Sequence, residues 1–325
     1  MSETPPLLYL SRGDIEALAI GPREVEAAVE DAFRAKAAGK ASLVPKLALH
    51  PAGGGAFFHA MPGALQPPRL AGVKWVSVAP AAPGRALPSV LALVILNDLE
   101  SGAPVAIMDG TWLTGLRTAA VSVVAARRLA RAEARTIGFV GCGVQARTHL
   151  AALRAHFPVA EVVAYSRRSA TAEAFAREAA APGLAARVTD DPREAVAGLD
   201  IVVTSVPPTP GPLGVLDPDW LAPGAFAALV DLGRSWRAEG IARIDRLVTD
   251  DRPHYAAAAA RTRLPYAGPF HAELGELVAG TASGRRSAQE RAMFFSTGIA
   301  LADIAVAALI AARARARGVG TALPW

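Results

Sequence analysis

Ten residues in the middle of the chain decide its fold: Ile137-Gly138-Phe139-Val140-Gly141-Cys142-Gly143-Val144-Gln145-Ala146. An apolar run that predicts a strand leads directly into the pattern G-x-G-x-x-A, and a helix pattern follows. Gly141 permits a tight turn, Gly143 lets the backbone approach a pyrophosphate, and Ala146 lets the helix pack closely on the strand. The free N–H groups of the first helical turn attract phosphate oxygens. The stretch predicts the opening of a dinucleotide-binding Rossmann domain.

The segments around and after this stretch alternate between strand and helix patterns. Strands are predicted at residues 136–140, 160–165, 187–188, 201–204, 225–232 and 246–249, and helices at 118–131, 145–156, 171–180 and 192–197. Such alternation is typical of an α/β protein with a doubly wound parallel sheet. A lone glycine-rich turn is also found at ordinary strand–helix connections, but this context favours a dinucleotide site.

The first third of the chain and its tail follow different patterns. A helix is predicted at 21–38, and strand-like runs separated by Pro and Gly are predicted at 43–50, 55–61, 70–78, 89–97 and 104–108. Consecutive strands with turns between them indicate an antiparallel or mixed sheet. The tail, residues 285–317, predicts one or two helices. Within it, residues 298–312 are apolar enough to pack on the first domain or on a partner subunit.

Length and composition narrow the class of protein. A chain of 325 residues suits two domains, and its low charged content, 19%, favours a homo-oligomer. The net charge of +5 comes from scattered arginines with no interleaved aromatic stripe, so we expect no nucleic-acid partner. No apolar stretch approaches the roughly 20 residues that span a bilayer, and no signal-peptide pattern opens the chain. We expect a cytoplasmic protein without a membrane partner.

The residues after the second Rossmann strand predict the choice of cofactor. An NAD site usually carries an acidic residue there for the ribose hydroxyls, but this chain has Ser166-Arg167-Arg168. Arginine binds a 2′-phosphate bidentately, so NADP is favoured over NAD. The alternative is that both arginines are merely solvated at a helix start.

The cysteine and the histidines indicate neither a nucleophile nor a metal. Cys142, the only cysteine, lies at a variable position of the turn and is interpreted as structural. The histidines show no metal-ligand spacing, and we expect no metal.

Several short motifs, in order and spacing, resemble those of the ornithine cyclodeaminase and mu-crystallin family over nearly the whole chain. They are Gly72-Val73-Lys74-Trp75, Asn97-Asp98 with Ser101-Gly102, Met108-Asp109-Gly110, Arg117-Thr118-Ala119-Ala120, the Gly141 turn, Glu273-Leu274-Gly275-Glu276, and Ser296-Thr297-Gly298 with Asp303.

The resemblance implies a Rossmann domain at 118–299 and a mixed α+β domain at 1–117 and 300–325. The mixed domain would bind the substrate and form a homodimer through its sheet. The chemistry it implies is hydride transfer at the α-carbon of an amino or imino acid. Lys46, Lys74 and Arg117 would hold the substrate carboxylate, while Lys74 and Asp231 would move protons. The predicted cofactor-binding residues are Thr118, Gly141, Gly143, Val144, Gln145, Ala146, Ser166, Arg167, Arg168 and Ser205.

Read from the residues, Lys74 and Arg117 are cations suited to a carboxylate. Arginine offers a bidentate fork, while a lysine is a point charge whose pKa falls when it is desolvated. An exposed position is the alternative for Lys74, but Lys74 lies between Val73 and Trp75 inside an apolar strand.

Two departures from the family pattern affect the expected activity. Cyclodeaminases of the family carry an Arg after the Pro near residue 45, where this chain has Lys46. The family's Asp-x-Pro-Gly-Lys segment is replaced by Val230-Asp231-Leu232-Gly233-Arg234-Ser235-Trp236, with Asp231 about two positions early. Both changes weaken an assignment as a true ornithine cyclodeaminase.

Three functions therefore stay open. The first is an ornithine cyclodeaminase-like enzyme, in which hydride leaves the α-carbon, ammonia is lost on ring closure and hydride returns to give proline. The second is an NADPH-dependent cyclic ketimine reductase or amino-acid dehydrogenase with net redox chemistry, which the Arg167-Arg168 end favours. The third is a non-catalytic NADPH-dependent small-ligand-binding protein of the mu-crystallin type. Retention of both Lys74 and Arg117 counts against this last function.

Overall fold

The chain folds into two compact units in a computed structural model that describes residues 6–52, 55–79, 87–207 and 214–324. The first unit comprises Met1–Arg117 with Ile299–Trp325, and the second comprises Thr118–Gly298. One boundary falls inside helix α3 (Gly110–Leu129), and the other falls just before helix α8 (Ala300–Arg317). No helix among the described residues is long and apolar enough to cross a membrane.

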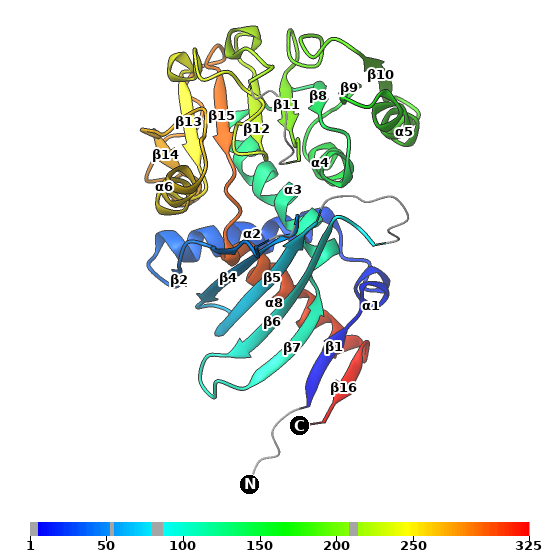
Figure 1. Ribbon diagram of the computed structural model, residues 1–325, viewed down its shortest axis with the longest axis vertical. Coiled ribbons are helices and arrows are strands. Elements are labelled where there is room, and N and C mark those ends of the chain that lie inside the picture. The colour runs from blue at the N-terminus through cyan, green and yellow to red at the C-terminus, as the bar shows by residue number, and fades with distance from the viewer. Residues whose placement is uncertain (1–5, 53–54, 80–86, 208–213, 325) are drawn as a thin grey trace. The chain divides into compact units, whose positions relative to one another are not determined.

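The second unit is built on a parallel sheet in the order β10-β9-β8-β11-β12-β15-β13-β14 (Figure 1). Its strands are β8 (Thr136–Val140), β9 (Glu161–Tyr165), β10 (Ala185–Thr189), β11 (Ile201–Thr204), β12 (Phe226–Leu229), β13 (Arg246–Thr249), β14 (Ala272–Glu273) and β15 (Ala292–Phe295). Its helices beyond α3 are α4 (Val144–Arg154), α5 (Ser169–Ala179), α6 (Arg252–Arg261) and α7 (Leu274–Ala279). The strand order reverses beside β8, as in a doubly wound Rossmann sheet, so the predicted fold class is confirmed.

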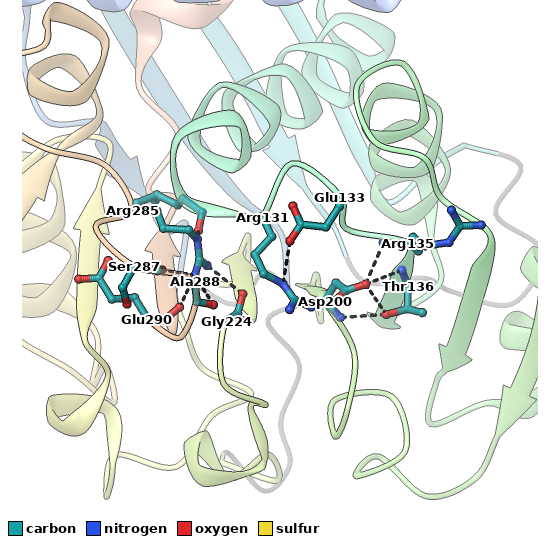
Figure 2. Close-up of polar contacts among 11 residues, drawn as sticks. Arg131, Glu133, Arg135, Thr136, Asp200, Gly224, Arg285, Ser287, Ala288 and Glu290 are labelled. Carbon is teal, nitrogen blue, oxygen red and sulfur yellow. Dashed lines mark hydrogen bonds and ion pairs between the residues drawn. The ribbon is translucent and has the colours of Figure 1, made fainter.

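The amino ends of these strands are tied together by an ionic network (Figure 2). Asp200, just before β11, accepts hydrogen bonds from Arg135 N at 2.8 Å and from both N and Oγ1 of Thr136 at 3.0 Å, and it pairs with Arg131. Arg285 donates to five backbone carbonyls, those of Leu129, Gly224, Ser287, Ala288 and Glu290. The network provides hydrogen-bond partners for the backbone N–H and C=O groups at the beginnings of the strands, where the sheet leaves them unpaired. In parallel sheets, ligands bind at the opposite, carboxyl ends.

The first unit is a mixed sheet covered on one face by helices. The sheet order is β16-β1-β7-β6-β5-β4-β2, with β3 paired to β4. Its strands are β1 (Leu7–Leu10), β2 (Ala41–Leu43), β3 (Leu47–Leu49), β4 (Phe57–Leu65), β5 (Leu70–Val78), β6 (Val90–Asp98), β7 (Pro104–Asp109) and β16 (Thr321–Leu323). Its helices besides α8 are α1 (Arg12–Ala17) and α2 (Pro22–Ala37). The antiparallel run from β4 to β7 and the parallel pair of β1 with β7 confirm the predicted mixed sheet.

Helix α8 packs directly on the inner face of this sheet, against β4, β5 and β6, and alongside α2. Two glycines allow the close approach, because a Cβ on Gly63 would lie 3.2 Å from the side chains of Ala300 and Ile304, and one on Gly72 would lie 3.4 Å from Ile304. The sequence predicts that residues 298–312 pack either on the first domain or on a partner subunit. In the structure they pack on the first domain.

The structure corrects four predicted elements. The tail is not purely helical, because Ala292–Phe295 forms the inner strand β15; four consecutive buried apolar residues carry no period that separates strand from helix. Helix α3 begins at Gly110, eight residues before its predicted start at 118. The single strand predicted at 43–50 is replaced by the end of β2 and by β3, and residues 192–197 form turns that end at Gly198, whose φ of 76° lies in the left-handed region.

Candidate functional site

The glycine-rich turn of the second unit has the geometry that the sequence predicts. Gly141 has a φ of 94°, and a Cβ there would lie 2.9 Å from the carbonyl oxygen of Ser205. Ser205 in turn donates its hydroxyl to the Gly141 carbonyl at 3.0 Å. Ala146 is fully buried beneath the turn, where a larger side chain would separate helix and sheet. Gly141, Ser205 and Ala146 therefore serve the protein's own packing.

Gly143 differs, because nothing in the protein requires a glycine there. Its φ is −85°, and a Cβ on it would meet no heavy atom within 4 Å. It is the N-cap of α4, where no side chain caps the helix, and the next residue, Val144, is exposed. An uncapped helix start beside open space fits a phosphate group bound by backbone N–H groups. These residues therefore fit the pyrophosphate of a dinucleotide.

The remaining predicted cofactor residues lie in the first turn of α4, on α3 and after β9. Gln145, in the first turn of α4, has a buried Oε1 without a hydrogen-bond partner among the described residues. Thr118 is buried on α3. Ser166, Arg167 and Arg168 follow β9 directly, and both arginines are exposed. Arg168 is the N-cap of α5 and makes no side-chain capping bond.

Cys142 and His149, beside the turn, are structural groups. Burial raises the pKa of the Cys142 thiol to about 12, so the thiolate is not formed near neutral pH. Burial lowers the pKa of His149 to about 4, and its neutral ring joins two helices. Its Nδ1 lies 2.7 Å from the Gln145 carbonyl, and its Nε2 lies 2.9 Å from Ser122 Oγ on α3.

A buried charged cluster lies in the first unit. Lys74 on β5 donates from Nζ to Asp303 Oδ1 at 2.7 Å, and both side chains are only 1% exposed. Arg117 on α3 forms an ion pair with the same oxygen, its Nε lying 2.9 Å away. Asp303 comes from α8, so three separate elements contribute one residue each. Two cations share one carboxylate, and the cluster carries a surplus positive charge when both are protonated.

The environment of Lys74 lowers its pKa to about 7. Burial is the largest cause, because it penalises the charged form, and the nearby Arg117 charge adds to it. Asp303 acts in the opposite direction, and Lys46 lowers the pKa further. Lys74 therefore lies near the midpoint of its titration at neutral pH, where a proton donor or acceptor works best.

Asp231, the predicted proton acceptor, lies in the turn after β12. Its Oδ1 accepts from Thr204 Oγ1 at 2.9 Å and from Gly233 N at 3.1 Å, and its Oδ2 accepts from the Ser235 hydroxyl. The predicted strand 225–232 ends at Leu229, and the chain then turns through Leu232, whose φ is 61°. The carboxylate is 4% exposed and is held by donors of its own unit.

Asp303 is the site residue that sequence reasoning missed. It belongs to the closing motif, but the sequence assigns the substrate carboxylate and the proton transfer to Lys46, Lys74, Arg117 and Asp231. The available signal was a single acidic residue in the Ala-rich run Ala300–Ala312, a position where burial demands a cationic partner.

The protein therefore combines a Rossmann-fold second unit, whose glycine-rich turn leads into an uncapped helix start, with a first unit that holds a buried lysine–arginine–aspartate cluster. The model of the ornithine cyclodeaminase/mu-crystallin family matches residues 9–318. The chain belongs to this family.

Three relatives illustrate the range of the family. The chain is 36% identical to an alanine dehydrogenase of Archaeoglobus fulgidus, over 98% of both chains. Its fold is similar to that of the Thermococcus litoralis Delta(1)-pyrroline-2-carboxylate reductase, solved with NADH and L-proline, with a TM-score of 0.87, 32% identity and coverage of 98% of this chain and 100% of that one. An archaeal alanine dehydrogenase dimer with bound NAD gives a TM-score of 0.86 at 35% identity, over 98% and 99% of the two chains.

Proposed function

We propose that the protein is a nicotinamide-dependent oxidoreductase that interconverts an α-imino acid and the corresponding α-amino acid. The observation that carries the proposal is the buried cluster of Lys74, Arg117 and Asp303. Its surplus positive charge suits one substrate carboxylate, and Lys74 holds a proton that it exchanges near pH 7. The relatives that act on alanine and on pyrroline-2-carboxylate support this substrate class.

The reaction divides between the cofactor and the residues of the chain. Reduction of a C=N bond adds a hydride to the α-carbon and a proton to nitrogen; the nicotinamide, when bound, supplies the hydride. Arg117 binds the substrate carboxylate, because a guanidinium can donate two parallel hydrogen bonds to the two oxygens of a carboxylate. Lys74 Nζ carries the proton that the substrate nitrogen gains or loses. Asp231 orders the turn after β12, since both of its oxygens already accept hydrogen bonds.

A cyclodeaminase is the second candidate, and the sequence departures argue against it. Lys46 replaces the family arginine, and the segment from Val230 to Trp236 lacks the Asp-x-Pro-Gly-Lys pattern. A lysine cannot reproduce a bidentate contact with a carboxylate. A lysine cyclodeaminase of known structure is 27% identical to this chain, less than the 32% of the reductase and the 36% of the alanine dehydrogenase.

We further propose that NADPH is the preferred cofactor. Arg167 and Arg168 follow β9 where an acidic residue would read the ribose hydroxyls, and arginine suits a 2′-phosphate. The two relatives described with NADH and NAD show the other choice within the family. Calorimetric titration with NADPH and NADH tests the preference. We expect the Arg167→Ala/Arg168→Ala variant to lose affinity for NADPH and to keep that for NADH; equal losses for both cofactors would contradict the assignment.

Turnover decides between the candidate functions. Purified protein would be followed at the nicotinamide absorbance with cyclic ketimines, and with alanine in the oxidative direction. Ornithine would be assayed in parallel by chromatography for proline. We expect stoichiometric NADPH oxidation with an imino acid. Proline formation from ornithine without net change in the cofactor would support the cyclodeaminase instead. Tight cofactor binding without turnover of any of these compounds would support the non-catalytic ligand-binding function.

A further inference from the structure

One oxygen of Asp303 contacts both functional cations of the first unit. Oδ1 accepts from Lys74 Nζ at 2.7 Å and lies 2.9 Å from Arg117 Nε, while Oδ2 is buried and has no hydrogen-bond partner among the described residues. A surface ion pair of this kind would be worth little, but the Lys74 and Asp303 side chains are only 1% exposed. At such burial, removing one partner leaves the other charge uncompensated.

We propose that Asp303 is a positioning residue: its Oδ1 fixes the Lys74 ammonium and the Arg117 guanidinium in one arrangement and keeps the proton on Lys74. This inference rests on the proposed function only for its consequence in turnover. The arrangement itself is a property of the first unit, since β5, α3 up to Arg117 and α8 all belong to it.

The charges around Lys74 define the expected effect of Asp303. Arg117 on α3 and Lys46 between β2 and β3 both disfavour a charged Lys74, and burial disfavours it most. Asp303 on α8 is the group that favours the charged form, through its charge and its hydrogen bond. Without the carboxylate, the ammonium would face two other cations in a dry environment, and its proton would leave at lower pH.

The test measures the titration of Lys74 directly and through turnover. The chain has four lysines, Lys36, Lys40, Lys46 and Lys74, so the spectrum of 13Cε-labelled lysine in the full chain is simple, and a Lys74→Met variant assigns the signal. We expect a midpoint near pH 7 in the unchanged protein. In Asp303→Asn, which keeps the shape and removes the charge, we expect the midpoint to fall by about one pH unit or more.

The same shift is expected in the pH profile of kcat/KM. Whether turnover needs the protonated or the neutral Lys74, the corresponding limb moves toward acid in Asp303→Asn, because the group titrates at lower pH. A merely structural role for Asp303 would lower activity equally at every pH and leave the limb in place. Asp303→Glu, which restores the charge, should return the limb toward its original position.

Glu24→Gln is the matched control, because Glu24 pairs with Arg313 on the same helix α8 at the surface. It should change neither the Lys74 midpoint nor the limb. If Asp303→Asn does not fold, Asp303→Ser replaces it, with the same expected shift. An unchanged Lys74 midpoint in a folded Asp303 variant overturns the proposal. Failure of the proposed function is recognised separately, as absence of turnover in the unchanged protein with the Lys74 shift still present.

Discussion

At the scale of single residues, the chemistry of the first unit depends on placing a lysine inside an apolar strand. Neighbouring side chains of β5 alternate between the two faces, and Lys74 points inward with Gly72 and Val76. An inward lysine is costly unless it meets an anion, and α8 provides Asp303. The strand thus converts a solvated ammonium into a group that titrates near neutral pH.

Replacing either cation should remove turnover and leave the cofactor site intact. We expect Lys74→Ala and Arg117→Ala each to lower kcat/KM. The loss of transition-state stabilisation should be about 2 to 5 kcal/mol for each variant. Turnover by Arg117→Lys should also be impaired, because a lysine ammonium cannot make the bidentate contact that an arginine guanidinium makes with a carboxylate. Steady-state kinetics with a parallel NADPH titration measure both effects. Near-normal turnover, or joint loss of activity and cofactor affinity, would show that the substrate site lies elsewhere.

The sequence predicts Lys74 and Arg117 but not their shared partner, for a physical reason. The lysine is marked by its apolar neighbours, and the arginine by a motif, both of which are local signals. The pairing of Lys74 with Asp303 joins residues 229 positions apart. It depends on the register of β5 in the sheet and on which face of α8 turns inward, and neither is encoded by a local pattern.

At the scale of elements, the strand–turn–helix around Gly141 contains two kinds of glycine. The fold itself requires Gly138, whereas the open space at Gly143 suits a ligand. A Cβ on Gly138 would lie 1.9 Å from the Ala195 carbonyl oxygen, whereas a Cβ on Gly143 would meet no heavy atom within 4 Å. The contrast makes the pair a direct test of the dinucleotide site.

We therefore expect Gly143→Ala to weaken NADPH binding at least tenfold while leaving the melting temperature nearly unchanged. Gly138→Ala is the matched control, and it should destabilise the protein by about 1 to 3 kcal/mol, because its methyl group overlaps backbone atoms. Calorimetric titration and thermal unfolding measure the two effects. Unchanged cofactor affinity in Gly143→Ala would argue against a pyrophosphate at this turn.

Asp200 should contribute stability at the amino ends of β8 and β11. Partial burial opposes its charge, but hydrogen bonds from the backbone of Arg135, from Arg131 and from Thr136 hold its pKa below the ordinary value. Its contribution is therefore present above the unfolded-state pKa of about 4 and is lost as the pH falls through the lower folded-state value.

We expect Asp200→Ala to lower the free energy of unfolding by about 2 to 4 kcal/mol at pH 7, and by less at acid pH. Glu133→Ala is the control in the same network (Figure 2). The Glu133 side chain is 74% exposed and lies as far as 4.0 Å from Arg131, so its removal should lower the free energy of unfolding very little. Urea unfolding at pH 7 and at pH 2.5, below the unfolded-state pKa of about 4, measures both variants. Equal losses for the two would mean that the network is not the source of stability.

Local patterns predict most elements of the chain and fail where they carry no period. The strands at 70–78, 136–140, 201–204 and 246–249 match β5, β8, β11 and β13, because each has a strand signal bounded by turns. Strand β15 is missed, since the buried run Ala-Met-Phe-Phe is followed by a long Ala-rich helix pattern. Its place between β12 and β13 is fixed only by the sheet.

At the scale of the whole molecule, the first unit presents an apolar outer sheet face opposite α8. The strand registers align two rows across this face, Leu47–Ala60–Trp75–Leu93 and Pro62–Val73–Ile95–Ile107–Tyr9. Leu47 is 65% exposed, Trp75 43% and Leu93 48%. Exposed apolar side chains gathered on one face are typical of an interface.

We propose that this outer face forms a homodimer. The low charged content of the chain, 19%, and the archaeal relative solved as a dimer support the proposal. Helix α8, for which the sequence leaves the first domain and a partner subunit open, is covered by its own sheet and by α2, so the outer face is the better candidate.

Light scattering at micromolar concentration should give twice the 33.5 kDa of the chain, or a higher even assembly. We expect Trp75→Glu combined with Leu93→Glu to give folded monomers, because two buried charges without partners oppose association. Val188→Glu, at a partly exposed apolar position on β10 of the second unit, is the matched control and should leave the mass unchanged. A monomer mass for the unchanged chain would refute the dimer, and a stable dimer of the double variant would place its interface on another surface.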